Sequence, residues 1–385
     1  MSKPFLIIPL ALFSLIFSCT VDQEREISQP SFDAEVFIEE LRLSDCPDKR
    51  VCIFDVSKGD NGTWSGTLSD EETMKSLQEM FDKQGIKHTI QLLPGKELEQ
   101  PFGLISVSTA QLRGKPKHSS ELVSQGLLGQ PIKILKRQDD WFYVQLVDGY
   151  LGWMESLSFT PISTQGLAEW TNSDRAFMLN KNRDVYDESG KVITELVAAN
   201  IISILGESKS NTIQIRLPDG QEGFVKDAKY MKTSYWENME IDTESLLDLA
   251  KDYMGIPYVW GGATIKGFDC SGYTKTLFLL HGIELPRDAS QQVRCGEEVN
   301  TDENFDQLQK GDLLFFGRKA TEEQKEKVTH VAVYLGDLDF IHASGEVRIQ
   351  SLDPNSERFA SNRLETYLRA KRVTEDCIGN YQHQL

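Results

Sequence analysis

The spacing of apolar residues changes several times along the chain and predicts four structured parts. A helical spacing over Asp70–Gln84 and a short apolar run over Val51–Val56 predict a small α/β region. Short apolar runs separated by turn residues predict two all-β units after it. Helical spacing followed by strand-like runs predicts an α+β part at the end. The predicted boundaries are therefore 20–100 for the α/β region, 101–165 and 166–238 for the two β units, and 239–385 for the α+β part.

The two β units repeat one pattern about 70 residues apart. Pro131–Leu135 precedes Val144–Gly149 in the first copy, and Ile201–Leu205 precedes Ile215–Gly220 in the second. A repeat of this kind indicates two copies of one small β module. Most aromatic side chains of such small barrels are expected to fill the barrel cores.

In the α+β part, one predicted helix carries a cysteine and the predicted sheet carries two histidines. The helical spacing of Thr243–Met254 comes first, and Cys270 then opens a second predicted helix that runs to Leu280. The strand-like runs that follow are Leu313–Phe316, His330–Leu335 and Phe340–Ala343. This order of elements places three reactive side chains, one thiol and two imidazoles, in one part of the chain.

An apolar run over Pro4–Phe17 follows Lys3 at the start of the chain. At roughly 14 residues it is shorter than the about 20 that span a bilayer, so it indicates an export signal over residues 1–19. The end of the run resembles a bacterial lipoprotein signal, in which the cysteine, here Cys19, is lipidated. We therefore expect an exported lipoprotein anchored to a membrane of the bacterial cell envelope, facing the periplasm or the outer surface. Ordinary signal cleavage with a soluble product is the alternative.

The charge balance excludes one class of partner. The chain has 41 Lys and Arg residues against 59 Asp and Glu residues, which gives a net charge of -18. A surface this acidic repels phosphate backbones, so we expect no nucleic-acid partner.

Export affects how the six cysteines are interpreted, because thiols outside the cytoplasm tend to oxidise. A local disulfide between Cys46 and Cys52 is expected. Cys295 and Cys377 either pair or stay as buried thiols, and the sequence does not decide between these alternatives. Cys270 is a candidate nucleophile, because a helix N-terminus and a neighbouring histidine both lower the pKa of a thiol.

His330 is the candidate base for Cys270, and His342 is the candidate third polar group that orients its imidazole. The two histidines are twelve residues apart with Gly336 at the midpoint. A hairpin that turns on Gly336 places them opposite one another on one face of the sheet. A turn on Asp337 and Leu338 places them on opposite faces unless a bulge intervenes.

Six motifs in this part resemble, in order, those of the NlpC-type cell-wall cysteine peptidases. They are Tyr258-Val-Trp-Gly-Gly262, Gly267-Phe-Asp-Cys-Ser-Gly272, Leu285-Pro-Arg-Asp-Ala-Ser290, Lys310-Gly-Asp-Leu-Leu-Phe-Phe316, His330-Val-Ala-Val-Tyr-Leu-Gly336 and Phe340-Ile-His-Ala-Ser344. The resemblance covers about Glu240–Arg372 and implies a papain-like α+β domain. It also implies that Cys270 is the nucleophile, His330 the base and His342 the third member of the catalytic group.

The first β unit, from Glu121-Leu-Val to Asp-Gly-Tyr-Leu-Gly-Trp153, resembles the bacterial SH3-like barrels of cell-wall enzymes. Two such modules before this domain resemble the γ-D-glutamyl-L-diamino acid endopeptidases, which act on cell-wall peptides with an unblocked N-terminal L-alanine. The resemblance implies peptidoglycan-derived substrates of the type L-Ala-γ-D-Glu-diamino acid and no metal or other cofactor. The substrate-binding residues that it implies are Tyr258, Trp260, Asp269, Ser271, Arg287 and Asp288 in the cleft, with Glu121 and Tyr150 at the substrate's amino end.

Several alternatives stay open at this point. Tyr258 and Trp260 lie in an apolar segment and have core packing as their other explanation. The segment Gly317–Thr329 is longer and more polar than the family pattern, so it lies on the surface or covers the cleft. Residues before Phe102 match no motif. Other possible functions are a papain-like amidase or acyltransferase with another substrate, and a catalytically idle lipoprotein that binds the cell wall.

Overall fold

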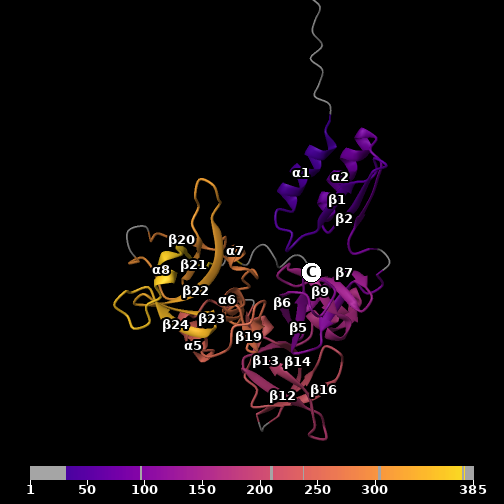
Figure 1. The fold of residues 1–385 in the computed structure, drawn as a ribbon. Helices are drawn as coiled ribbons and strands as arrows, with labels where there is room; N and C mark the ends of the chain where they lie inside the picture. The colour runs from indigo at the N-terminus through magenta and orange to yellow at the C-terminus, as the bar shows by residue number, and fades with distance from the viewer. Residues whose placement is uncertain are drawn as a thin grey trace, which may run out of the picture.

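The computed structural model describes residues 32–374 and residue 377, with short gaps at 96–97, 209–210, 237 and 302–304. The predicted signal and Cys19 lie outside the described residues. Figure 1 shows the N-terminal region at one end of the molecule, the two β units below it, and the α+β part beside them. No helix within the described residues is long and apolar enough to cross a membrane.

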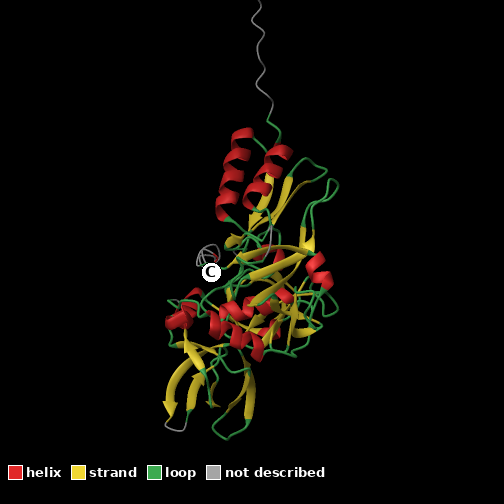
Figure 2. Cartoon of the chain, turned by 90° about the vertical axis from the view of Figure 1, so that its left-hand side faces the viewer, coloured by secondary structure: helices red, strands yellow, loops and turns green. Residues whose placement is uncertain are grey.

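The N-terminal region consists of two helices against a small sheet (Figure 2). The elements are α1 (Ala34–Asp45), β1 (Phe54–Lys58), β2 (Trp64–Leu68), α2 (Glu71–Gln84) and β3 (His88–Leu92). Helix α2 confirms the predicted helix, because the Asp70 side chain caps its start and Gly85 ends it in the left-handed conformation. The strand predicted over Val51–Val56 begins later, at Phe54, because the preceding residues form a loop closed by the Cys46–Cys52 disulfide.

Each β unit is a seven-stranded antiparallel sheet. The first contains β4 (Phe102–Ile105), β5 (Thr109–Arg113), β6 (Leu122–Leu127), β7 (Pro131–Gln138), β8 (Trp141–Gln145), β9 (Leu151–Glu155) and β10 (Phe159–Ile162). After the short helices η1 (Ser156–Ser158) and α3 (Thr164–Thr171), the second contains β11 (Arg175–Met178), β12 (Asn182–Tyr186), β13 (Val192–Val197), β14 (Ile201–Ser208), β15 (Thr212–Arg216), β16 (Glu222–Lys226) and β17 (Tyr230–Lys232).

The two sheets share one strand order. The first is ordered β10-β4-β7-β8-β9-β5-β6, and the second, taken from its other edge, is β17-β11-β14-β15-β16-β12-β13. Strand β7 begins 70 residues before β14, because their first residues are Pro131 and Ile201. The predicted repeat is therefore confirmed as a repeated strand order.

The last part of the chain has helices packed on an antiparallel sheet, which confirms the predicted α+β class. Its helices are α4 (Thr233–Trp236), α5 (Thr243–Asp252), α6 (Cys270–Leu279), α7 (Ala289–Gln292) and α8 (Ser361–Glu365). A short ribbon pairs β18 (Ala263–Thr264) with β19 (Gly267–Phe268). The main sheet has the order β20-β25-β21-β22-β23-β24. Its strands are β20 (Glu297–Val299), β21 (Leu313–Arg318), β22 (Lys327–Gly336), β23 (Asp339–Ser344), β24 (Glu346–Ser351) and β25 (Tyr367–Arg372).

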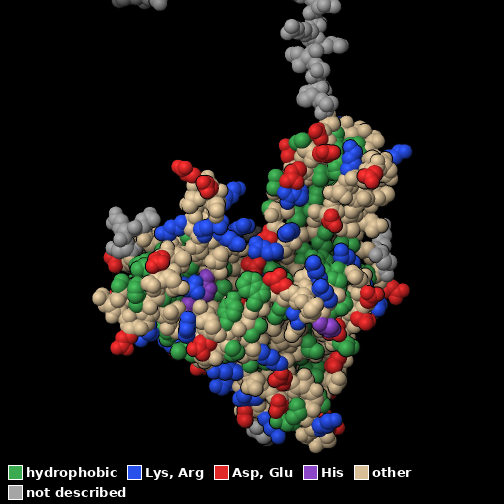
Figure 3. All heavy atoms as spheres, in the orientation of Figure 1, with side chains coloured by type: hydrophobic (Ala, Val, Ile, Leu, Met, Phe, Trp, Pro, Cys, Tyr) green, Lys and Arg blue, Asp and Glu red, His purple; other side chains and the backbone are tan. Residues whose placement is uncertain are grey.

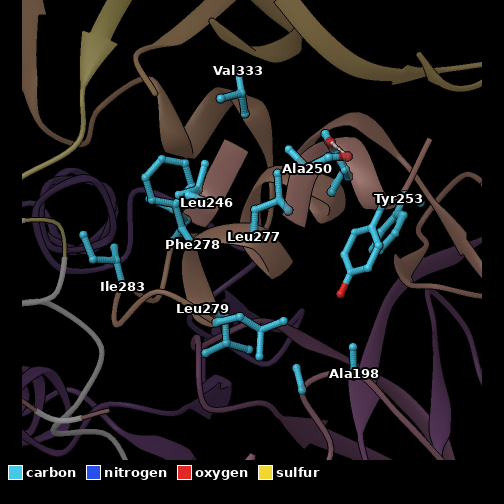
Figure 4. Close-up of a cluster of buried hydrophobic side chains, with 14 of the residues drawn as sticks. Ala198, Leu246, Ala250, Tyr253, Leu277, Phe278, Leu279, Ile283 and Val333 are labelled. Carbon is cyan, nitrogen blue, oxygen red and sulfur yellow. Dashed lines mark hydrogen bonds between the residues drawn. The ribbon is translucent and has the colours of Figure 1, made fainter. Parts of the chain in front are cut away.

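One hydrophobic core joins the α+β part to the β units. Figure 4 shows Leu246 of α5 beside Phe278 of α6, with Val333 of β22 on one side and Ala198 of the second β unit on the other. All four side chains are buried. Burial of apolar surface across these elements holds the β units firmly against the helix that carries Cys270.

The segment Gly317–Thr329 is a surface hairpin. Strand β21 continues to Arg318 and β22 starts at Lys327, so both ends of the predicted loop belong to paired strands and residues 319–326 connect them. The residues at its tip are exposed, and the hairpin projects from the sheet in Figure 1. Of the two alternatives for this segment, the surface position is the one observed.

Candidate active site

Cys270 is the first residue of α6 and lies against β22. Asp269 caps the helix by accepting a hydrogen bond from the Gly272 backbone N–H at 2.7 Å. A Cβ on Gly272 would lie 2.1 Å from the Gly262 carbonyl oxygen, so only glycine lets the helix start approach this backbone. The backbone N–H of Val331 donates to the Cys270 thiol, which places the thiol against β22 at the residue after His330.

The thiol of Cys270 is buried, with 7% of the residue exposed. Burial raises the pKa of this thiol to about 11, and the neighbouring Asp269 carboxylate raises it further, although the Val331 N–H acts in the opposite direction. The sequence-based prediction of a lowered thiol pKa is therefore wrong for the unliganded protein. Burial outweighs the helix N-terminus because it disfavours the charged form of the thiol.

His330 and His342 lie on one face of the sheet because of a bulge. The turn between β22 and β23 is formed by Asp337 and Leu338, whose φ angles of 51° and 62° are those of a two-residue hairpin turn. This is the later of the two turns considered from the sequence. The register shifts between Tyr334 and Gly336, and the extra residue returns the two histidines to the same face.

The two imidazoles are joined by a hydrogen bond, with His330 Nε2 2.7 Å from His342 Nδ1. Their rings are nearly perpendicular, at 87°. Burial lowers the pKa of His342 to about 3, and burial, His342 and Arg363 lower that of His330 well below its usual value. Both rings are therefore neutral near pH 7. When His330 donates to His342, its Nδ1 is left as a proton acceptor.

An ion pair between Arg287 and Asp269 stabilises the start of α6. The Arg287 guanidinium contacts both carboxylate oxygens of Asp269, at 2.6 and 3.0 Å, and also donates to Ser271 Oγ at 3.1 Å. A further nitrogen donates to Ser124 in β6. Only 1% of Arg287 is exposed. Arg287 is therefore a positioning residue, in contrast to the prediction that it lines the surface of the cleft.

The first β unit meets the α+β part at Trp260. The indole Nε1–H donates to Glu121 Oε1 at 2.9 Å. Gly261 has a φ of 76°, and a Cβ there would lie 2.3 Å from the Leu122 carbonyl oxygen, so glycine is required for this approach. Trp260 is 63% exposed, which rules out core packing for it, whereas Tyr258 is half-buried at the edge of the core.

Asp288 receives two contacts from other parts of the chain. The Tyr150 hydroxyl donates to Asp288 Oδ2 at 3.1 Å, and Arg50 of the N-terminal region pairs with the same oxygen at 2.7 Å. The Lys275 ammonium of α6 lies 3.2 Å from Asp148, whose carboxylate accepts from the Tyr150 backbone N–H. Tyr150 is therefore fixed at its backbone by Asp148 and at its hydroxyl by Asp288.

The structure brings most of the predicted site residues into one connected group. Contacts run from Glu121 through Trp260 and Gly261 to Asp269, and Arg287 then leads to the neighbouring Asp288 and Tyr150. Cys270 follows Asp269 directly. The predicted cleft residues thus surround the start of α6.

Three site residues were missed from the sequence. Arg50 lies in the loop between the two bonded cysteines, which is the one signal that pointed to it. Lys275 interrupts an apolar helix, and a lone buried lysine indicates a buried carboxylate partner. Nothing in the sequence pattern distinguishes Arg363 from a surface arginine.

Within the parts of the chain that the structure describes, no group of three or more His, Cys, Asp and Glu side chains is arranged to hold a metal ion. The reactive groups that the structure places at the site are a thiol, two imidazoles and the first turn of α6.

Comparisons with known proteins agree with this arrangement. The model of the NlpC/P60 family matches residues 255–367, and the model described as the bacterial dipeptidyl-peptidase Sh3 domain matches residues 112–158. The first match includes the three candidate catalytic residues, and the second includes Glu121 and Tyr150.

The match with this chain covers most of the length of two curated relatives. A γ-D-glutamyl-L-lysine dipeptidyl-peptidase from Bacillus cereus (strain ATCC 10987 / NRS 248) is 32% identical over 66% of this chain and 76% of the relative. A dipeptidyl-peptidase 6 from Lysinibacillus sphaericus is 30% identical over 65% of this chain and 91% of the relative. The crystal structure of an NlpC/P60 family protein from Bacillus cereus ATCC 10987 has a TM-score of 0.61 and 27% identity, and covers 71% of this chain and 99% of that chain.

Proposed function

The chain belongs to the NlpC/P60 family of cell-wall peptidases, and on that premise we propose that it cleaves the amide between the γ-carboxyl of D-glutamate and a diamino acid. The preferred substrates are peptides that begin with a free L-alanine. The observation that carries this proposal is the set of contacts at the start of α6, which connect Glu121, Tyr150 and Asp288 to the turn that carries Cys270.

Cys270 is the nucleophile in this mechanism. Its sulfur attacks the γ-carbonyl carbon as His330 Nδ1 takes the thiol proton, so the neutral thiol needs no prior ionisation. The tetrahedral intermediate then collapses, the C–N bond breaks, and His330 gives its proton to the leaving amine. A water molecule, deprotonated by His330, hydrolyses the acyl-enzyme and restores the thiol.

His342 keeps His330 in the required tautomer. Its Nδ1 accepts from His330 Nε2, and the positive charge that His330 gains during attack is spread toward this acceptor. The Gln350 side chain lies near His342 and raises the pKa of that ring, which partly offsets the burial. The first N–H groups of α6 face the position where the oxyanion forms, and they are the donors for it in this proposal.

The amino end of the substrate lies between the first β unit and Asp288. A free ammonium group there is met by the Glu121 and Asp288 carboxylates, with Tyr150 as a further hydrogen-bonding group. Acetylation removes the positive charge, so the two carboxylates lose their attraction for the amino end, which disfavours blocked peptides. In this proposal, the enzyme therefore selects short released peptides that have a free amino end.

Two further parts of the proposal concern the modules and the location. We take both β units as SH3-like modules, because the second repeats the strand order of the first. We also keep the export signal and a lipid on Cys19 as part of the proposed location in the cell envelope. A mass spectrum of the protein purified from membranes tests the lipid, since an unmodified N-terminus at another residue contradicts it.

The test of the function follows cleavage by mass spectrometry. The parent protein, Cys270→Ala and Glu121→Gln each act on L-Ala-γ-D-Glu-diaminopimelate with a free or an acetylated amino end. The expected result is release of L-Ala-D-Glu from the free peptide by the parent, none by Cys270→Ala, and a reduced preference for the free peptide in Glu121→Gln.

Gln221→Ala is the matched control, because Gln221 precedes β16 as Tyr150 precedes β9. It is expected to behave as the parent. Equal cleavage of both peptides by the parent removes the amino-end pocket from the proposal but keeps the peptidase. No cleavage of either peptide refutes the proposed reaction.

A further inference from the structure

Arg363 of α8 lies beside the two histidines. Its guanidinium stands over the Phe316 ring, 5.6 Å from the ring centroid, and donates to Ser344 Oγ at 3.3 Å. The Phe316 ring is itself 5.9 Å from the His330 ring. Ser344 ends the strand that carries His342. These contacts place a cation at the histidine side of the candidate active site.

This cation has no acidic partner among the described residues. Other partly or fully buried arginines near the site are paired with carboxylates: Arg287 with Asp269, and Arg50 with Asp48 and Asp288. The charged groups that interact with Arg363 are instead Cys270, Tyr258 and Arg348. A half-buried guanidinium that faces an aromatic ring, a hydroxyl and two histidines, and no carboxylate of the described residues, is suited to bind an anion from outside.

Arg348 adds a second positive charge at the same place. It lies directly opposite His342 in the pairing of β23 with β24, so both side chains point to the same face of the sheet. Arg348 is exposed, and it too forms no ion pair within the described residues. Figure 3 shows basic side chains at the surface of the α+β part.

A positive charge next to a general base lowers the pKa of that base and so weakens it. Arg363 lowers the pKa of His330 and of His342, because each imidazolium would be repelled by the guanidinium. An anion bound to Arg363 cancels this repulsion at the moment when His330 takes the thiol proton. A substrate that brings its own anion would therefore also restore the basicity of the histidine.

We propose that Arg363, assisted by Arg348, binds a substrate carboxylate adjacent to the scissile amide and makes the enzyme select an acid over an amide at that position. The inference rests on the proposed function, whose substrate carries a carboxylate on each side of the scissile bond: the α-carboxylate of D-glutamate and that of the diamino acid. The cleft then has carboxylates at the amino end of the substrate and arginines at the histidine side. Opposite charges at its two sides fix the direction in which the peptide binds.

The test compares three peptides: L-Ala-γ-D-Glu-L-Lys, the same peptide with the glutamate α-carboxylate as an amide, and the same peptide with a C-terminal amide. The parent should cleave the acid peptide with a kcat/KM at least about tenfold above that of one amidated peptide, the loss typical of a charged hydrogen bond. The amide that lowers kcat/KM identifies the carboxylate.

Arg363→Ala should lose at least about tenfold on the acid peptide and little on that amidated peptide, since the group it recognises is already absent. Arg363→Lys should recover part of the preference because it keeps the charge. Arg358→Ala is the matched control, since Arg358 is exposed and pairs with Asp339 on the same domain. The acid limb of kcat/KM should also move to higher pH in Arg363→Ala, because the histidines regain basicity.

An equal loss on all three peptides in Arg363→Ala, with an unchanged pH profile, overturns the inference and assigns Arg363 a structural role. The same holds if the parent shows no preference for the acid. Failure of the proposed function gives a different result, since the parent then cleaves none of the three peptides, and the inference fails with it.

Discussion

The guanidinium of Arg50, in the disulfide-closed loop of the N-terminal region, lies 2.7 Å from the Asp288 carboxylate that also accepts from the Tyr150 hydroxyl. The same loop is fixed on its other side. The Arg50 carbonyl accepts from the Leu151 backbone N–H at 2.8 Å, and Asp48 accepts from Gln291 at 2.9 Å. A part of the chain that matched no motif therefore touches the first β unit and the candidate cleft together.

Arg50→Ala should impair substrate binding more than chemistry. Loss of the guanidinium leaves Asp288 with Tyr150 as its remaining contact from outside the domain, so the carboxylate becomes free to move. We expect KM for the free-amino peptide to rise about tenfold, which is about 1.4 kcal/mol, with a smaller change in kcat. Arg42→Ala is the control, because Arg42 pairs with Glu39 on the surface of α1. A fall in kcat at constant KM would contradict a positioning role for Arg50.

Opening the Cys46–Cys52 disulfide should have a related but weaker effect. A crosslink around so short a loop restricts the unfolded chain by about 2 kcal/mol, and it also holds Arg50 in place. The Cys46→Ser/Cys52→Ser double variant should therefore melt at a lower temperature and show a raised KM while it still cleaves the peptide. Kinetics and thermal unfolding of the parent and double variant measure both effects, and an unchanged KM would show that Arg50 keeps its position without the crosslink.

Protein stability should decrease in acid because of the two histidines. Their folded-state pKa values lie below the unfolded value of 6.5, so the unfolded state binds more protons as the pH falls. The stabilisation is present above about pH 6.5 and is lost as the pH falls toward the folded-state values. The shift of His342 alone corresponds to a loss of about 2 kcal/mol between pH 7 and pH 5, and His330 acts in the same direction.

Urea unfolding of the parent and of His342→Gln across this range measures that loss. The variant should show a shallower decrease in the free energy of unfolding. His118→Asn is the control, because His118 is exposed on the first β unit. If the parent and His342→Gln have parallel pH profiles, His342 is charged in the folded protein at pH 5.

Alkylation of Cys270 by iodoacetamide should be slow at pH 7 in the unliganded protein. Its thiol has a pKa raised to about 11, and the thiolate is the reactive form. The rate should rise steadily with pH up to that value, as followed by mass spectrometry of the peptide that contains Cys270. A rate that is already maximal at pH 7 would show a Cys270–His330 ion pair in the free enzyme.

The two remaining described free cysteines form a contact that the sequence left undecided. The Cys295 and Cys377 thiols hydrogen bond to one another, and both line a cavity of about 540 Å³ beside the N-terminal loop. Oxidation by a disulfide reagent such as oxidised glutathione should join them, and intact mass should then fall by the two hydrogen atoms transferred to the reagent. Persistence of both free thiols under oxidation would show that their geometry does not permit a bond.

Local patterns predicted much of the fold. The helical spacing over Asp70–Gln84 predicted α2 well, because periodicity is a property of neighbouring residues. The repeat of Pro131–Leu135 at Ile201–Leu205 likewise predicted a repeated strand order. The start of β1 was missed because the disulfide loop and its contacts with the first β unit, which are distant in sequence, fix the residues before Phe54.

In the candidate site, too, local patterns predicted some features, and others depend on the whole fold. Cys270, His330 and His342 carry their own signals of residue type and spacing, but their relative orientation depends on the bulge near Leu335, which no spacing rule specifies. The thiol pKa was predicted in the wrong direction because burial is a property of the whole fold. Arg363 was missed for the same reason, since its role depends on which carboxylates are absent around it.

The repeated strand order of the two β units has a consequence for how this protein can change. The candidate catalytic groups lie within one continuous segment, whereas Glu121 and Tyr150 belong to one of two duplicated sheets and Arg50 to a separate region. Under the proposed function, a substitution in the β units or the N-terminal loop alters which amino ends are accepted while the thiol and imidazoles stay as they are. Recognition of the amino end is then encoded partly in other stretches of the gene than the reactive groups, so natural variation can adjust one and spare the other.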